Sequence, residues 1–257
     1  MPALAAAQSP QGGPAAGTWR YGASLYLYLP SLSGKSSAPA DSNGTPIGVS
    51  AEQIVDSLQF TLMGSFEAHN GRWGVFTDAM YLNLGGSKQQ SRDFTIGRAE
   101  APAGATADLD WDFKGLIWTL AGEYRVLAGP KLTLDALAGA RRFDVQTTSS
   151  WSITGNLGPL LPSGRTGNAE TSVTALDGIV GVKGRMKLDG RWSVPFYLDV
   201  GAGDSELTWQ ALAGISYAFE WGELTAAWRY LAYEMKAGKS FTDVSFNGPL
   251  IGATWRW

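Results

Sequence analysis

The stretch Asp189-Gly-Arg-Trp-Ser-Val-Pro-Phe-Tyr-Leu-Asp-Val200 decides the fold of this chain. It begins with a glycine-containing tight turn and continues with apolar residues at every second position. The apolar positions are Trp192, Val194, Phe196, Leu198 and Val200, and the positions between them include Ser193, Tyr197 and Asp199. Successive side chains of a β-strand point to opposite faces, so this alternation predicts a strand with one apolar and one polar face.

The same alternation occurs in ten segments along the chain. They are Trp19–Leu29, Leu58–Glu67, Trp73–Leu84, Leu116–Arg125, Leu132–Arg141, Leu176–Met186, Trp192–Val200, Leu207–Phe219, Leu224–Glu234 and Ile251–Trp257. This pattern predicts an all-β, antiparallel, up-and-down β-barrel of about ten strands, with eight or twelve as alternatives. One transmembrane barrel is expected to cover residues 18–257.

Alternation alone also fits a soluble β-sandwich, and the connections decide between the two folds. Tight turns are expected at His69–Arg72, Ala128–Pro130, Asp189–Arg191 and Glu220–Gly222. Long polar loops are expected at 31–57, 87–107 and 150–170, on the opposite side. Short turns at one end and longer loops at the other are typical of outer-membrane barrels.

Aromatic residues provide a second argument for a membrane barrel, because their rings favour the membrane–water boundary. One set lies beside the short turns: Trp19, Tyr21, Trp73, Tyr124, Trp192, Phe219, Trp255 and Trp257. A looser set lies toward the other strand ends: Trp111, Phe143, Trp151, Trp209, Tyr230 and Phe241. Two belts are therefore expected, whereas a sandwich would bury its aromatics in mid-strand.

The composition agrees with a strand-built membrane protein. The chain is 44% hydrophobic but only 17% charged, which is low for a soluble domain. It contains no apolar stretch of about 18 residues, so no transmembrane helix is expected. The net charge of −3 gives no reason to expect a nucleic-acid partner, and the absence of cysteine excludes disulfides and thiolate metal sites.

The first residues resemble the end of a secretory signal peptide. Ala5-Ala6-Ala7 provides a small-residue cleavage pattern before Gln8. Residues 1–17 are therefore expected to be a signal-peptide remnant and flexible leader, with a disordered alanine-rich leader as the alternative.

Several longer stretches resemble a family of proteobacterial outer-membrane β-barrels that is related in architecture to the small OmpA-like barrels. They include Trp19-Arg-Tyr-Gly-Ala-Ser-Leu-Tyr-Leu-Tyr-Leu-Pro30, Trp73-Gly-Val-Phe-Thr-Asp-Ala-Met-Tyr-Leu82, Leu207-Thr-Trp-Gln-Ala-Leu-Ala-Gly-Ile-Ser-Tyr217 and Gly248-Pro-Leu-Ile-Gly-Ala-Thr-Trp-Arg-Trp257. The resemblance implies a bacterial outer-membrane location, with membrane lipid and lipopolysaccharide as neighbours, and it implies no established activity.

The C-terminal stretch resembles the signal by which the barrel-assembly machinery recognises such proteins. The residues that carry it are Ile251, Ala253, Trp255 and Trp257. The family usually ends in Phe, and Trp257 takes that place here.

Charged residues on the polar faces are the main candidate site. Their parity places six acids and six bases in the lumen: Glu67, Asp78, Glu123, Asp135, Asp177 and Asp199 with Arg20, Arg125, Arg141, Lys183, Arg185 and Arg229. Charges far from bulk water require partners, so a salt-bridge network that fills the barrel is the leading interpretation. A narrow pore or a polar ligand site in the lumen is the alternative.

Other residues give weaker signals. The single histidine, His69, is expected to be a solvated turn residue without a catalytic role. Asp108, Asp110 and Asp112 are weak candidates for a calcium site, against a solvated acidic rim. Ser50-Ala-Glu-Gln53 has the capping-box pattern of a short helix, which would form a lid or simply lead into the next strand.

The leading functional hypothesis is a non-enzymatic outer-membrane barrel that needs no cofactor and acts as a structural element or narrow passive channel for small polar solutes. The alternative is a surface adhesion or binding module that acts through the long loops. A lipid-modifying enzyme is a third hypothesis. The sequence leaves the oligomeric state open.

Overall fold

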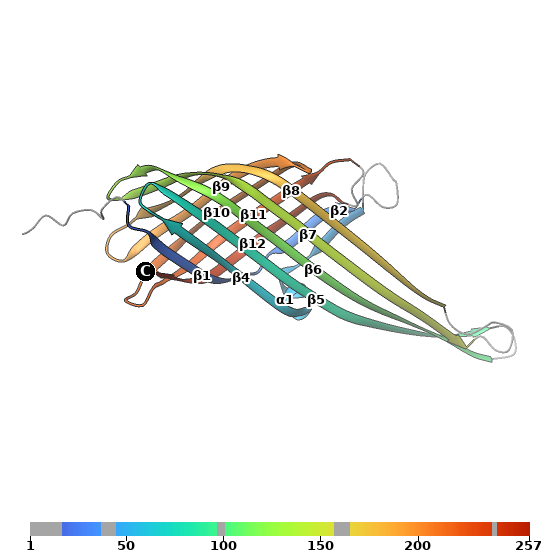
Figure 1. Ribbon diagram of the computed structural model, residues 1–257. Helices are drawn as coiled ribbons and strands as arrows, with labels where there is room; N and C mark the ends of the chain where they lie inside the picture. The colour runs from blue at the N-terminus through green and yellow to red at the C-terminus, as the bar shows by residue number, and fades with distance from the viewer. Residues whose placement is uncertain (1–16, 37–44, 97–100, 157–164, 238–240) are drawn as a thin grey trace, which may run out of the picture.

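The computed structural model describes residues 17–36, 45–96, 101–156, 165–237 and 241–257 (Figure 1). Residues 1–16 lie outside this range, so most of the expected leader 1–17 is not described. None of the helices among the described residues is long and apolar enough to cross a membrane.

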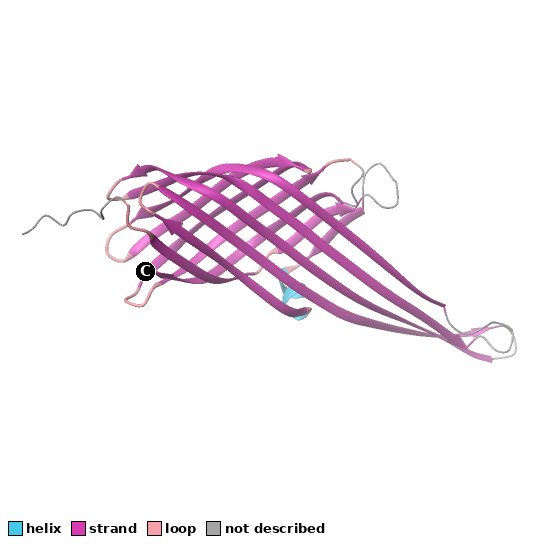
Figure 2. Cartoon of the chain, in the orientation of Figure 1, coloured by secondary structure: helices cyan, strands magenta, loops and turns pink. Residues whose placement is uncertain are grey.

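Ten antiparallel strands form a closed barrel, as predicted (Figure 2). In barrel order they are β1 (Arg20–Tyr28), β4 (Leu58–His69), β5 (Trp73–Ile96), β6 (Ala101–Ala128), β7 (Leu132–Asn156), β8 (Arg165–Lys187), β9 (Trp192–Gly203), β10 (Ser205–Ala218), β11 (Glu223–Met235) and β12 (Phe241–Arg256). Closure comes from the pairing of β1 with β12, which runs from Gly22↔Arg256 to Tyr28↔Leu250. A closed ladder leaves no sheet edge within the barrel, which a lipid environment requires.

The four predicted tight turns connect strands at one end of the barrel, which we call the short-turn end. Between β4 and β5, the Asn70 side chain accepts hydrogen bonds from the backbone N–H groups of Arg72 (3.0 Å) and Trp73 (2.8 Å). Gly71 adopts a φ of 93° and Gly190 a φ of 69° in the β8–β9 turn. Only glycine takes such angles without strain, which explains why these turns contain it.

The outer surface of the barrel is apolar, because the residues predicted to face outward do so. Leu25 on β1, Leu62 on β4, Leu198 on β9 and Ile251 on β12 are each more than half exposed. Such a surface is suited to hydrocarbon and not to water.

The aromatic belt at the short-turn end is present. Trp73 packs against Tyr124 with ring centroids 4.7 Å apart, and Tyr21 stacks on Trp257 at 6.1 Å.

The second set of aromatics was partly misassigned. Trp209 and Tyr230 do stack with each other, at 4.6 Å. Phe143, however, is only 2% exposed and lies inside the barrel. Phe143 lies two residues after the buried Arg141 on β7, so the two side chains point to the same side of the strand. The alternation in the sequence already indicates this inward orientation.

The expected long loops at 87–107 and 150–170 are largely strands. β5, β6, β7 and β8 are 23 to 28 residues long, whereas the other barrel strands have 9 to 16. They continue as a paired four-stranded sheet well beyond the rest of the barrel (Figure 1). The prediction failed because polar stretches without apolar alternation lack the signal used to find strands, although they can still pair with each other.

Residues 31–57, the third expected loop, are also structured in the described part. Strand β2 (Ser31–Ser36) pairs with β12 and with β3 (Thr45–Val49). Helix α1 (Ala51–Asp56) follows, and Ser50 and Gln53 form the predicted capping box, with reciprocal bonds of 3.2 and 2.9 Å. The helix prediction is confirmed, and its role as a lid remains a prediction.

Candidate functional site: the barrel interior and the extended sheet

The deepest charged pair in the lumen joins β7 and β9. Arg141 contacts Asp199 through both guanidinium amino groups, and its Nε donates to Thr119 Oγ1 at 3.1 Å. Arg141 is 0% exposed and Asp199 2%. Two charges this far from water persist only because each satisfies the other.

A second buried pair connects β11 with β5 across the lumen. Arg229 donates to Asp78 at 2.9 Å and to Gln210 at 2.7 Å. The Tyr26 hydroxyl donates to Asp78 at 2.8 Å and accepts from Arg229 at 3.1 Å. The guanidinium of Arg229 therefore makes four hydrogen bonds, counting the second bond to Gln210 at 3.2 Å.

Nearer the short turns, Lys183 on β8 forms an ion pair with Glu67 on β4 and another with Glu123 at 3.0 Å. Arg125 pairs with Asp135 on the neighbouring strand. The lysine reaches across the barrel, because β5, β6 and β7 lie between β4 and β8 in the strand order.

The ion pairs at the mouth include two residues that were missing from the predicted set. Arg185 donates to Glu223 at 2.6 Å, and Arg256 donates to the same carboxylate at 2.8 Å. Glu223 has the parity of Arg229 and lies one residue before the predicted segment Leu224–Glu234. Arg256 has the parity of Leu250 and lies within the predicted segment Ile251–Trp257, so the parity rule applied to both positions identifies them.

Two predicted members stand apart from these ion pairs. Arg20 is exposed at the short-turn end and makes no ion pair with the described residues. Asp177 is 0% exposed and accepts a hydrogen bond from the Ser205 backbone N–H at 2.8 Å. Arg141 lies directly across the ladder from Asp177 but turns to Asp199.

The prediction that His69 is a solvated turn residue is wrong. His69 ends β4, is 5% exposed and lines the lumen. Its Nδ1 accepts the backbone N–H of Gly71 at 2.8 Å, and its Nε2 lies 3.5 Å from Asp135. The alternation of β4 continues two residues past Glu67, which carries the imidazole inward.

Beyond the charged pairs, toward the extended sheet, the lumen is filled by apolar side chains. They come from eight barrel strands, and the largest are Tyr28, Met63, Met80, Ile117, Phe143, Leu231, Tyr233 and Met235. Leu231 is 0% exposed and Tyr233 1%, and the rings of Phe143 and Tyr233 are 4.6 Å apart. This packing, which we call the apolar layer, closes the lumen at its level.

On the other side of the apolar layer, a cavity of about 880 Å³ remains. It extends from the level of Asp78 and Arg229 to Gly190, Arg191 and Trp257 at the short-turn end. The interior is thus hollow and charged at one end and packed and apolar at the other.

The extended sheet carries polar side chains on its outward face. On β6 the exposed Trp118 and Leu120 give way to exposed Lys114, Asp112 and Asp110. The fourteen residues from 101 to 114 span roughly 45 Å at the usual rise per strand residue. This change from apolar to polar marks where hydrocarbon would end and water begin.

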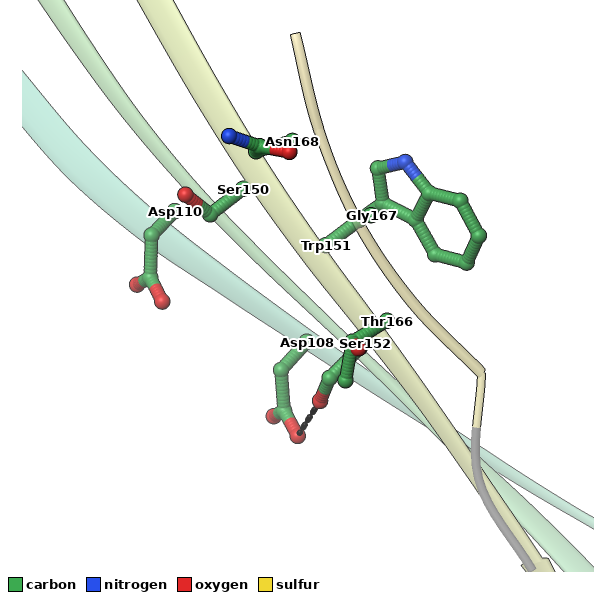
Figure 3. A pocket seen from close by; sticks show the side chains of 8 residues that line it. All are labelled: Asp108, Asp110, Ser150, Trp151, Ser152, Thr166, Gly167 and Asn168. Carbon is green, nitrogen blue, oxygen red and sulfur yellow. Dashed lines mark hydrogen bonds between the residues drawn. The ribbon is translucent and has the colours of Figure 1, made fainter.

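A shallow pocket of about 350 Å³ lies on this sheet (Figure 3). Asp108, Asp110, Ser150 and Asn168 project to one side, and Trp151 lies on the other. Trp151 covers Gly167 on β8, where a Cβ atom would lie 2.5 Å from the indole ring. The indole ring can occupy this position only because residue 167 is glycine and has no side chain.

The three aspartates do not form a metal centre, because no group of three or more ligating side chains suited to a metal ion occurs in the described ranges. Alternate residues on a strand lie almost 7 Å apart, which is too far for three carboxylates to share one calcium ion. Ser152 donates to Asp108 at 3.4 Å.

The C-terminal residues lie on the outer surface beside the closing strand. Ile251 is 60% exposed, Trp255 39% and Trp257 63%. The backbone of Trp257 exchanges two hydrogen bonds with Tyr21, at 2.9 and 3.1 Å. Recognition of this end, including Ala253, by the assembly machinery remains a prediction.

No protein-family model matches the chain, and no curated protein is a significant match to it. Among solved structures, the outer membrane protease OmpT from Escherichia coli is similar over 97% of this chain and 100% of its own, with 10% identity and a TM-score of 0.47. The fold is a closed, antiparallel, ten-stranded β-barrel.

Two other structures are similar over most of their length. The translocator domain of the autotransporter NalP from Neisseria meningitidis covers 96% of this chain and 90% of its own, with 14% identity and a TM-score of 0.39. The attachment invasion locus protein Ail of Yersinia pestis covers 93% and 98%, with 12% identity and a TM-score of 0.32. These likenesses concern the barrel fold and not an activity.

Proposed function

We propose that the protein is an integral barrel of the bacterial outer membrane, with lipid and lipopolysaccharide as its immediate surroundings. A closed ladder with an apolar outside and an aromatic belt supports this location. Fractionation of cells that express the full chain tests it: the protein should float with outer-membrane vesicles and require detergent for extraction.

Within that membrane, the protein acts as a non-enzymatic scaffold that displays the β5–β8 sheet at the cell surface for recognition. The observation that carries this proposal is the hydrogen-bonded sheet itself, which continues to Ile96↔Ala101 and Ile153↔Arg165 beyond the last pairing with β4 and β9. A rigid sheet outside the membrane presents its side chains without the entropy cost of ordering a loop.

The described outward face of this sheet is acidic. Asp108, Asp110, Asp112 and Glu170 lie on it, with Lys114 and Arg142 near the membrane boundary. Opposite charge steers association and favours basic partners. A basic protein segment is therefore the class of partner that this face fits.

Binding of a labelled lysine-rich ten-residue peptide to the protein in detergent micelles tests recognition. Replacing residues 85–112 and 148–170 by Asn-Gly joins Leu84 to Phe113 and Thr147 to Thr171, which are register partners. The trimmed protein lacks all four acidic residues and should no longer bind the peptide, while the barrel still folds. The D108N/D110N/D112N/E170Q variant should also weaken binding.

The matched control removes four acidic charges elsewhere, in E52Q/D56N/D189N/E220Q, and should bind as the parent protein does. Equal losses in both quadruple variants would show that net charge, and not the sheet, attracts the peptide. Retained binding by the trimmed protein would contradict the display function.

A narrow passive channel is the second candidate, favoured by the charged cavity at the short-turn end. The apolar layer stands against it, since ions would have to cross a packed level that contains Leu231 and Tyr233. Planar-bilayer recordings should show no steady ion current through the parent protein. A steady current would favour the channel.

A lipid-modifying enzyme is the least supported candidate. The only histidine of the chain is buried at the short-turn end, far along β4 from the extended sheet. Incubation with phospholipid and lipid A should give no turnover, and any turnover that H69A abolishes would overturn the non-enzymatic proposal.

A further inference from the structure

The cavity at the short-turn end has the size and the enclosure of a small-molecule site. Its volume of about 880 Å³ is within the usual range for ligand pockets. The lumen encloses it, the apolar layer lies behind it, and Gly190, Arg191 and Trp257 lie at its open end. A ligand would therefore enter from the side of the short turns.

The lining of this cavity is net positive. Eight basic side chains line it against four acidic ones, and Glu123, which pairs with Lys183 from behind, adds a fifth acid. Three of the basic groups, Arg20, Lys187 and Arg191, are exposed at the mouth and make no ion pair with any described residue. Positive charge without a partner, focused by low-dielectric walls, raises the local concentration of anions.

His69, which is buried in the wall of the cavity, provides a hydrogen-bond donor without an acceptor. Its Nδ1 accepts the Gly71 N–H, so the hydrogen of the neutral ring is assigned to Nε2. Nε2 has no hydrogen-bond partner among the described residues, because Asp135 is 3.5 Å away and already holds Arg125. A buried donor that lines a cavity and lacks an acceptor is costly unless a ligand or water supplies one.

Residues on the two neighbouring strands determine the position of the His69 imidazole. Gly74 lies directly across from His69, and a Cβ atom there would be 2.5 Å from the ring. On the other side, Arg20 is the register partner of His69, so their side chains share one patch of the wall. Arg20 and His69 therefore lie side by side on the cavity wall at the short-turn end.

We propose that this cavity binds a small organic anion that carries at least two phosphate or carboxylate groups. One anionic group would accept from His69 Nε2, and another would lie among Arg20, Lys187 and Arg191. This site is separate from the recognition sheet and opens at the opposite end of the molecule, so it adds a function to the one proposed above.

Isothermal titration of the full chain, folded in a non-ionic detergent, tests the proposal with two probes, pyrophosphate and citrate. Saturable binding of one probe molecule per chain, weakened by added salt, is the expected result. The probe that binds more tightly identifies phosphate or carboxylate as the preferred group. Failure of both probes to bind at millimolar concentration would overturn the proposal.

Two triple variants distinguish a specific binding site from a general attraction between opposite charges. R20Q/K187Q/R191Q should raise the dissociation constant about tenfold or more, since charge-assisted hydrogen bonds are lost. K35Q/K114Q/K236Q removes the same charge at the other end of the molecule and should leave affinity within about twofold. Equal losses in both variants, or none in the first, would overturn the proposal.

The contribution of the His69 donor to binding is tested separately. H69A should weaken the tighter-binding probe about three- to tenfold while the mouth remains intact. Near-UV circular dichroism checks that each variant folds. Arg20, Lys187 and Arg191 are exposed, so R20Q/K187Q/R191Q should fold. This variant therefore tests the proposal even if H69A fails to fold. Unchanged affinity in a folded H69A protein would remove His69 from the site.

Discussion

The two halves of the barrel interior are built on the same alternation and are filled in different ways. Toward the short turns, Lys183 and Arg229 form ion pairs with acidic residues around a cavity, and Arg141 pairs with Asp199. Toward the extended sheet, Phe143, Leu231 and their neighbours pack against each other. The difference teaches that alternation along a strand tells which side chains point into the lumen but not whether they are polar. On β7 the inward face changes from charged to apolar within two residues, between Arg141 and Phe143.

The largest expected effect comes from breaking the deepest pair. R141M should lower the free energy of unfolding by about 3–5 kcal/mol, because it leaves Asp199 buried without a cation. Urea titration of the protein in lipid vesicles measures this. The double variant R141M/D199L should recover most of the loss, since both charges are then gone.

The neighbouring residue provides the matched control. Arg142 is exposed on the outer face and pairs with Asp144 at 2.7 Å, so R142Q should change the unfolding free energy by less than about 0.5–1 kcal/mol. A loss in R142Q as large as that in R141M would show that burial in the lumen does not set the cost.

The apolar layer should give a somewhat smaller effect. F143A should cost about 3 kcal/mol, near the lower end for a buried Phe, since the flexible side chains of Met63, Met80 and Met235 can move into the space. The same urea titration measures it. A cost below about 1 kcal/mol would contradict a packed layer, and a steady ion current through F143A would identify Phe143 as part of the closure.

Among the ion pairs of the lumen, the smallest effect is expected at the mouth. The Arg256 side chain is 51% exposed, and its partner Glu223 keeps Arg185 at 2.6 Å. R256Q should therefore lower the unfolding free energy by less than about 1 kcal/mol. If its cost equals that of R141M, the gradient from the deep lumen to the mouth does not exist.

The candidate site was only partly predictable. Parity placed Arg141, Asp199 and Asp78 on inward faces, because a period of two needs no tertiary information. The predicted set lacks Glu223, which lies one residue before the segment Leu224–Glu234, and Arg256, which has inward parity within the segment Ile251–Trp257. It also left His69 in a turn, although the inward face of β4 continues to that residue.

The sequence does not predict which charged residues form ion pairs with each other. Glu67 and Lys183 lie on β4 and β8, and Arg229 and Asp78 on β11 and β5, so only closure of the barrel brings them together across the lumen. The ladder partner of Arg141 is Asp177, yet its ion pair is with Asp199. Strand tilt and side-chain reach decide such choices.

The sequence by itself determined the ten alternating segments, the tight turns with Gly71 and Gly190, the capping box at Ser50 and the outward apolar surface, because each depends on neighbours a few residues apart. Only the tertiary structure decided that 87–96 and 101–107 are strands, since a polar segment becomes a strand when a partner lies beside it. It also decided that the lumen is hollow at one end and packed at the other, because filling depends on side chains that meet across the barrel.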